Sequence, residues 1–113
     1  MKKFIALYMA PVSALEGWAK TDPETKKAEE KKMQNDWNAW MGKNRSAVKT
    51  TEGLGKNKSI TSAGVADAKN GMMLYSFVEA ESHEAAAELF KDHPHLGIPN
   101  ASIEIMEASP LAG

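Results

Sequence analysis

The sequence predicts an α+β fold in which a four-stranded antiparallel sheet carries two helices on one face. Two apolar runs, at residues 3–10 and 72–80, are typical of buried strands. Two further stretches combine a helix start signal with apolar residues at helical spacing. Because 113 residues is an ordinary length for one domain, we assign residues 1–113 to a single domain.

The composition excludes several classes of function. Lys and Arg total 14 against 15 Asp and Glu, a net charge of -1, so we expect neither nucleic acid nor a membrane surface as a partner. The chain has no cysteine, which excludes disulfides and thiolate chemistry and suits a reducing, cytoplasmic compartment. No apolar run approaches the ~20 residues of a membrane span.

The first strand is predicted over residues 3–10. Tyr8 and Pro11 interrupt the apolar run, which favours a strand over a secretory signal. The run is apolar at every position, so we expect both of its faces to be covered. Residues 12–20 have no clear period and are expected to be a connection that contains Trp18.

A long helix is predicted from Pro23 to about Met41. Asp22 suits the N-cap, and Pro23 suits the first helical position. The first half of this helix is almost entirely charged, and its apolar face comes late, at Met33, Trp37, Trp40 and Met41.

The middle of the chain is predicted to contain short strands and loops. Residues 47–51 are a short strand candidate, and residues 52–59 are a loop rich in glycine and lysine. Residues 59–61 return as an edge strand, residues 62–71 form a turn or loop, and residues 72–80 form the second strong strand.

The second helix follows directly. Ser82 is predicted to cap it, and Pro94 ends it, so His93 belongs to the exit from the helix. The last strand is predicted over residues 101–107. The buried stripe of this helix is predicted to be Ala85, Ala86, Leu89 and Phe90.

This order of elements is that of a ferredoxin-like βαββαβ fold with both helices on one side of the sheet. The two strong strands stay apolar on their other face as well. An uncovered apolar face marks an interface, and the simplest cover is the same face of a second chain. We therefore expect a homodimer whose sheets pack through their open faces.

The chain also resembles the YCII-related (DGPF-type) family of the dimeric α+β barrel superfamily. The resemblance rests on the opening MKKFIALYM, the segment WNAWM and the stretch from Tyr75 to Gly113. Its most specific part is the short helix followed by HPHL and the final strand. It implies the same fold and the same dimer. The D-G-P-F signature itself is absent; the nearest stretch is residues 64–68, and Thr51-Glu52-Gly53 stands where relatives often have Asp-Gly.

The cluster from Asp92 to His95 is the best candidate for chemistry. A histidine titrates near neutral pH, and a neighbouring carboxylate can orient it, so His93 or His95 could transfer a proton with Asp92 as the orienting group. The alternative is a structural corner in which these side chains satisfy backbone groups freed by Pro94. Two histidines are too few for a typical zinc site, so no metal or other cofactor is assigned.

Four aromatic residues are candidates for ligand binding. Trp37 and Trp40 share one helix face and could wall a pocket for a flat ligand, although such a stripe is also typical of core packing. Tyr8 and Tyr75 could each direct a hydroxyl into a cavity or serve as core residues.

Two functions remain open on this reading. One is a small cofactor-free enzyme that acts on a small organic molecule between the sheet and the helices. The other is a non-catalytic dimeric ligand-binding or accessory module. They differ in whether a histidine ring faces a cavity or has both of its nitrogens bound by backbone groups.

Overall fold

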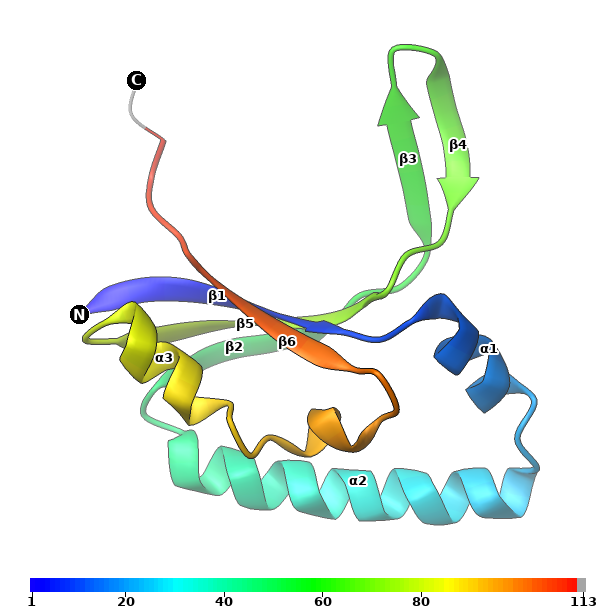
Figure 1. Ribbon diagram of the computed structural model, residues 1–113, viewed down its shortest axis with the longest axis horizontal. Coiled ribbons are helices and arrows are strands. Elements are labelled where there is room, and N and C mark those ends of the chain that lie inside the picture. The colour runs from blue at the N-terminus through cyan, green and yellow to red at the C-terminus, as the bar shows by residue number, and fades with distance from the viewer. Residues whose placement is uncertain (112–113) are drawn as a thin grey trace.

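The computed structural model describes residues 1–111 and contains a four-stranded antiparallel sheet, a separate two-stranded sheet and three α-helices (Figure 1). Residues 112–113, the end of the predicted single domain, lie outside the described part. The elements in chain order are β1 (Lys2–Met9), α1 (Val12–Ala19), α2 (Pro23–Asn44), β2 (Val48–Gly53), β3 (Asn57–Thr61), β4 (Gly64–Ala68), β5 (Met72–Ala80), α3 (His83–Leu89), the 3-10 helix η1 (Pro94–Gly97) and β6 (Ser102–Glu107).

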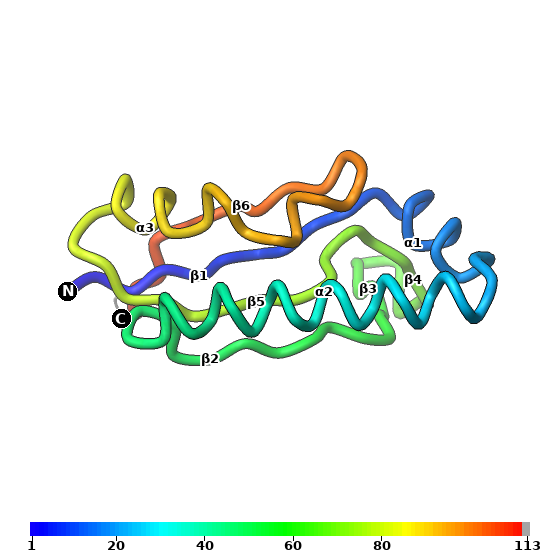
Figure 2. The backbone as a smooth tube through the Cα atoms, turned by 90° about the horizontal axis from the view of Figure 1, so that it is seen from below, coloured from blue at the N-terminus to red at the C-terminus, as the bar shows by residue number. Residues whose placement is uncertain are grey.

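The main sheet has the strand order β2-β5-β1-β6, and every neighbouring pair is antiparallel. The helices α2 and α3 lie on the same side of this sheet (Figure 1). Seen from that side, α2 runs along β5 and β2, while α3 lies beside β6 and β1 (Figure 2). The predicted antiparallel sheet is therefore confirmed, and its helix-facing side holds the core.

The central strand β1 separates the two faces of the sheet by simple alternation. Phe4, Ala6 and Tyr8 are buried against the helices, whereas Ile5 and Leu7 are half-buried on the other face. The apolar run of β1 therefore belongs to a strand that has only one of its faces covered by other residues of the chain.

Both predicted helix starts are confirmed. The Asp22 side chain accepts a hydrogen bond from the Thr25 N–H at 2.9 Å, and the Ser82 hydroxyl accepts one from the Ala85 N–H at 3.1 Å. The helix α2 ends at Asn44, a little beyond the predicted end at about Met41. Of the predicted stripe of the second helix, Ala86 and Phe90 are buried and Leu89 is half-buried, whereas Ala85 is exposed.

Two segments predicted to be irregular are in fact ordered elements. Residues 12–20 contain α1, which follows Pro11 and has no fully buried residue; Val12, Leu15 and Trp18 are half-buried along it. Residues 62–71 contain β4, which pairs with β3 as an antiparallel hairpin. Gly64, with a φ of 130°, supplies a backbone conformation at the turn that favours glycine. The predicted edge strand at residues 59–61 therefore belongs to this hairpin and not to the main sheet.

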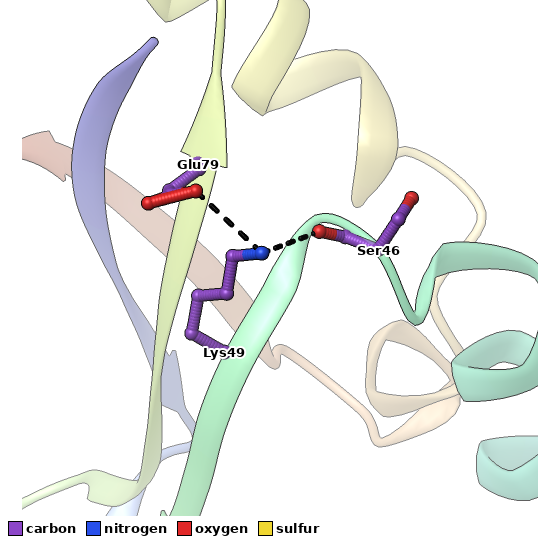
Figure 3. Close-up of polar contacts among 3 residues, drawn as sticks. All are labelled: Ser46, Lys49 and Glu79. Atoms are coloured by element: carbon purple, nitrogen blue, oxygen red, sulfur yellow. Dashed lines mark hydrogen bonds and ion pairs between the residues drawn. The ribbon is translucent and has the colours of Figure 1, made fainter.

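A surface contact ties the start of β2 to β5. The Lys49 ammonium donates a hydrogen bond to the Ser46 carbonyl at 2.8 Å and lies 3.5 Å from a Glu79 carboxylate oxygen (Figure 3). Both charged side chains are almost half exposed, so this pair contributes little to stability.

Candidate functional site

The candidate site lies at the corner between α3 and β6. His93 precedes Pro94 in an extended conformation, as proline requires of its neighbour. The ring Nδ1 of His93 accepts a hydrogen bond from the His95 N–H at 3.0 Å and thereby caps the 3-10 helix η1. One nitrogen of His93 is therefore occupied by the backbone.

His95 is a structural link at this corner. Its buried ring donates from Nε2 to the Met9 carbonyl at 2.9 Å, which ties η1 to the end of β1. Burial lowers the pKa of His95, and the carbonyls of Met9 and Ser102 partly oppose that shift. The ring is thus held mainly by backbone groups, as expected for a structural histidine.

His93 differs from His95 at its second nitrogen. The residue is 2% exposed, and its Nε2 is buried without a hydrogen-bond partner among the described residues. Because Nδ1 accepts a hydrogen bond, the neutral ring carries its proton on Nε2. Burial, with a smaller contribution from His95, lowers the pKa of His93 to about 4, so the ring is neutral at pH 7. The result is a buried N–H donor without an acceptor.

Three aromatic side chains lie around the His93 ring, and a fourth, Phe90, stacks on it with ring centroids 5.9 Å apart. The centroid of the His93 ring lies 4.3 Å from that of Trp37, 4.5 Å from that of Trp40 and 5.2 Å from that of Tyr8. All three are edge-on contacts. Trp40 is fixed because its Nε1 donates to the Leu89 carbonyl at 3.1 Å. Three of the four predicted aromatic residues therefore meet at His93.

Two predicted site residues lie elsewhere. Tyr75 is on the opposite face of the sheet, where its hydroxyl donates to the Glu52 carboxylate. Asp92 is exposed and lines a shallow groove of about 450 Å³ between α2 and α3. Within residues 1–111, Asp92 forms no hydrogen bond or ion pair with His93 or His95. The structure thus gives neither histidine a carboxylate to orient it.

A chain of hydroxyls on the helix-facing side was not predicted. The Tyr8 hydroxyl lies 2.7 Å from the Ser76 Oγ, which in turn lies 2.6 Å from the Thr51 Oγ1. Ser76 is fully buried, and burial raises the pKa of Tyr8 although its bond to Ser76 acts in the opposite direction. The available signal was Ser76, a polar residue in the middle of the strand MMLYSFVEA, whose other polar residue, Glu79, lies near its end.

The third histidine has a structural role. The Nε2 of His83 lies 2.7 Å from the Ile105 carbonyl, and its ring stacks on Phe4 with centroids 5.4 Å apart. In the described part of the chain, no group of three or more His, Asp or Glu residues is placed to hold a metal ion. No helix between residues 1 and 111 is long and apolar enough to cross a membrane.

Comparison with known proteins adds nothing to this geometry: neither the protein-family models nor the curated proteins include a match to this chain.

Proposed function

We propose that the protein is a homodimeric, ferredoxin-like module that binds a small organic molecule at His93. The strand order β2-β5-β1-β6 with α2 and α3 on one side agrees with a βαββαβ arrangement into which the β3–β4 hairpin is inserted. This arrangement is also what the resemblance to the YCII-related family implies, so we propose membership of that family.

The unpartnered Nε2–H of His93 is the observation that carries the binding proposal. A buried donor without an acceptor costs about 1–3 kcal/mol, and such a group in a native protein calls for an explanation. An acceptor on a bound ligand would recover that cost. Trp37 is only half-buried, so its indole is the wall that can move to admit the ligand. The expected ligand is a small flat molecule that carries one acceptor, such as a carbonyl oxygen.

The low pKa of His93 favours binding over acid–base catalysis. A ring with a pKa of about 4 is protonated in only about 0.1% of molecules at pH 7 and is a weak base. A catalytic histidine works best with a pKa near the working pH. The non-catalytic module is therefore the better-supported of the two functions.

One observation favours proton transfer as a second candidate function. The hydroxyls of Tyr8, Ser76 and Thr51 form a continuous hydrogen-bonded chain from the aromatic cluster toward the edge strand β2. Such a chain can pass a proton by successive donor exchange. This function would make the protein a small cofactor-free enzyme.

The open face of the sheet supports the proposed homodimer. Ile5 lies opposite both Phe77 and Met106, and Leu7 lies opposite Tyr75, so these apolar side chains share the face that no helix covers. This apolar patch, which Glu52 and Glu104 border on the same face, is of the kind that is typical of an interface. The same face of a second copy would cover it by two-fold symmetry.

The dimer is tested by Phe77→Glu, which places a charge in the centre of the open face. We expect analytical ultracentrifugation to show a dimer for the wild type and mostly monomer for F77E. The control is Gln34→Glu, which adds the same charge at an exposed position of α2 and should remain dimeric. A monomeric wild type would refute the proposed assembly.

Binding is tested with two probes of similar shape, acetophenone and ethylbenzene, of which only the first carries an acceptor. The readout is the NMR shift of the Trp37 and Trp40 indole N–H signals. We expect wild type to prefer acetophenone by about 5–10-fold, the value of one hydrogen bond. His93→Asn keeps an acceptor near the position of Nδ1 but removes Nε2–H, so the preference should vanish.

His93→Gln is the matched control, because its amide keeps a donor near the position of Nε2 and should retain the preference. Equal preference in wild type and H93N would refute the role of His93.

The enzyme candidate is tested in the same samples prepared in D2O. Protein-catalysed loss of the acetophenone methyl proton signal would establish proton transfer, and its absence would leave binding alone.

A further inference from the structure

The β3–β4 hairpin, residues 57–68, projects from the body of the molecule as an arm. Its two strands pair with each other and not with the main sheet. It rises on the side of the open sheet face, away from α2 and α3 (Figure 1). The radius of gyration is 16.0 Å, whereas a compact domain of this length would have about 13 Å. The chain alone is therefore not fully compact.

One face of the arm is apolar near its tip. Ile60 and Val65 lie directly opposite each other and are 78% and 65% exposed. Lys58 and Asp67 form an ion pair at 2.6 Å on the same face, closer to the base. An isolated two-stranded hairpin is at best marginally stable in water, so an arm of this kind gains stability when it packs on another surface.

A groove at the base of the arm offers an apolar surface. Its volume is about 870 Å³, and it lies between α1 and the segments that enter and leave the arm. Neither Ile60 nor Val65 is among the residues that line it. The helix α1 beside it has no fully buried residue. The apolar residues that line the groove are Val12, Leu15, Ala19, Leu54, Ala68, Met72 and Met73.

We propose that each arm crosses the dimer interface and seats Ile60 and Val65 in this groove of the second copy. The inference rests on the proposed homodimer. The arm is long enough, because a five-residue strand spans roughly 17 Å while packed sheets are about 10 Å apart. The arm therefore passes the plane of the facing sheet. Two-fold symmetry repeats this contact, so the arm of each copy lies in the groove of the other. Both the apolar arm residues and the grooves are then covered.

The contact is tested by cross-linking, because the natural chain contains no cysteine. A chain with Ile60→Cys is mixed with a chain with Leu15→Cys, and the disulfide-linked pair is measured after mild oxidation. The control is Ala66→Cys, which lies on the opposite face of the arm. We expect the I60C and L15C pair to form at least tenfold faster than the A66C and L15C pair.

A second measurement tests the energetics. The double variant I60S/V65S removes the apolar pair, and we expect the dissociation constant of the dimer to rise tenfold or more, whereas A66S should leave it unchanged. Equal cross-linking of I60C and A66C, or an unchanged dissociation constant for I60S/V65S, would overturn the arm contact.

The two proposals fail in different ways. A wild-type dimer that is disrupted by F77E but is unaffected by I60S/V65S refutes the arm alone. A wild-type chain that is monomeric at all accessible concentrations refutes the dimer and the arm together.

Discussion

The buried ring of His93 should make folding stability depend on pH. Its pKa is lowered from 6.5 to about 4, chiefly by burial and also by His95. The unfolded chain therefore binds this proton first as the solution is acidified. The contribution of His93 to the free energy of unfolding has its full value above pH 6.5 and decreases as the pH falls toward 4. The free energy of unfolding lost through His93 is about 2 kcal/mol between pH 7 and pH 5, and the total loss below pH 4 is at most about 3 kcal/mol.

The matched variant is His93→Asn, which retains an acceptor for the His95 N–H but cannot titrate. Urea unfolding is followed by circular dichroism at pH 7 and pH 5, at one protein concentration. Groups that do not interact with His93 contribute equally in the two proteins and cancel in the difference. We expect wild type to lose about 2 kcal/mol more than H93N between the two pH values. Equal losses would show that the His93 proton is not coupled to folding.

Three further predictions concern stability and are read from urea unfolding at pH 7. Ser76→Ala should cost about 1–3 kcal/mol because the buried Tyr8 hydroxyl loses its partner; a change below 0.5 kcal/mol would contradict the hydroxyl chain. Gly71→Ala should cost about 1–3 kcal/mol, since a Cβ there would clash with the backbone oxygen of Ala10. Gly17→Ala has open space around it and should stabilise α1 by about 0.5–1 kcal/mol; the opposite ranking would refute this. Ser82→Ala should cost about 1 kcal/mol through the lost N-cap, and an unchanged midpoint would argue against that cap.

The elements that could be predicted from the sequence are those with strong local signals. The strand at Met72–Ala80 was placed correctly because an apolar run of that length has few other interpretations. The arm was predicted only in part, as an edge strand at residues 59–61. Most of its residues are small or polar, and its two strands pair only with each other. The helix α1 was missed because its eight residues, four of them exposed, span little more than two helical turns, which is too short a stretch to establish a helical period.

The candidate site likewise contains residues whose positions could be predicted from the sequence and residues whose positions could not. Trp37, Trp40 and His93 were singled out by residue type and helical spacing, and the structure brings them together. Tyr75 was misplaced because the face of a strand residue depends on register, and a shift of one residue reverses it. Asp92 is adjacent to His93 in sequence, yet its side chain points to solvent where the chain turns at Pro94.

The position of β1 in the sheet has a consequence for biosynthesis. This strand precedes both of its partners, β5 and β6, in the chain, so that Lys2 pairs with Ala80 and Phe4 with Glu107. During translation its apolar residues emerge long before either partner, and they remain without a sheet until those two strands follow. Contacts of such high sequence separation also slow folding. The nascent chain is therefore expected to depend on chaperones more than its small size would suggest.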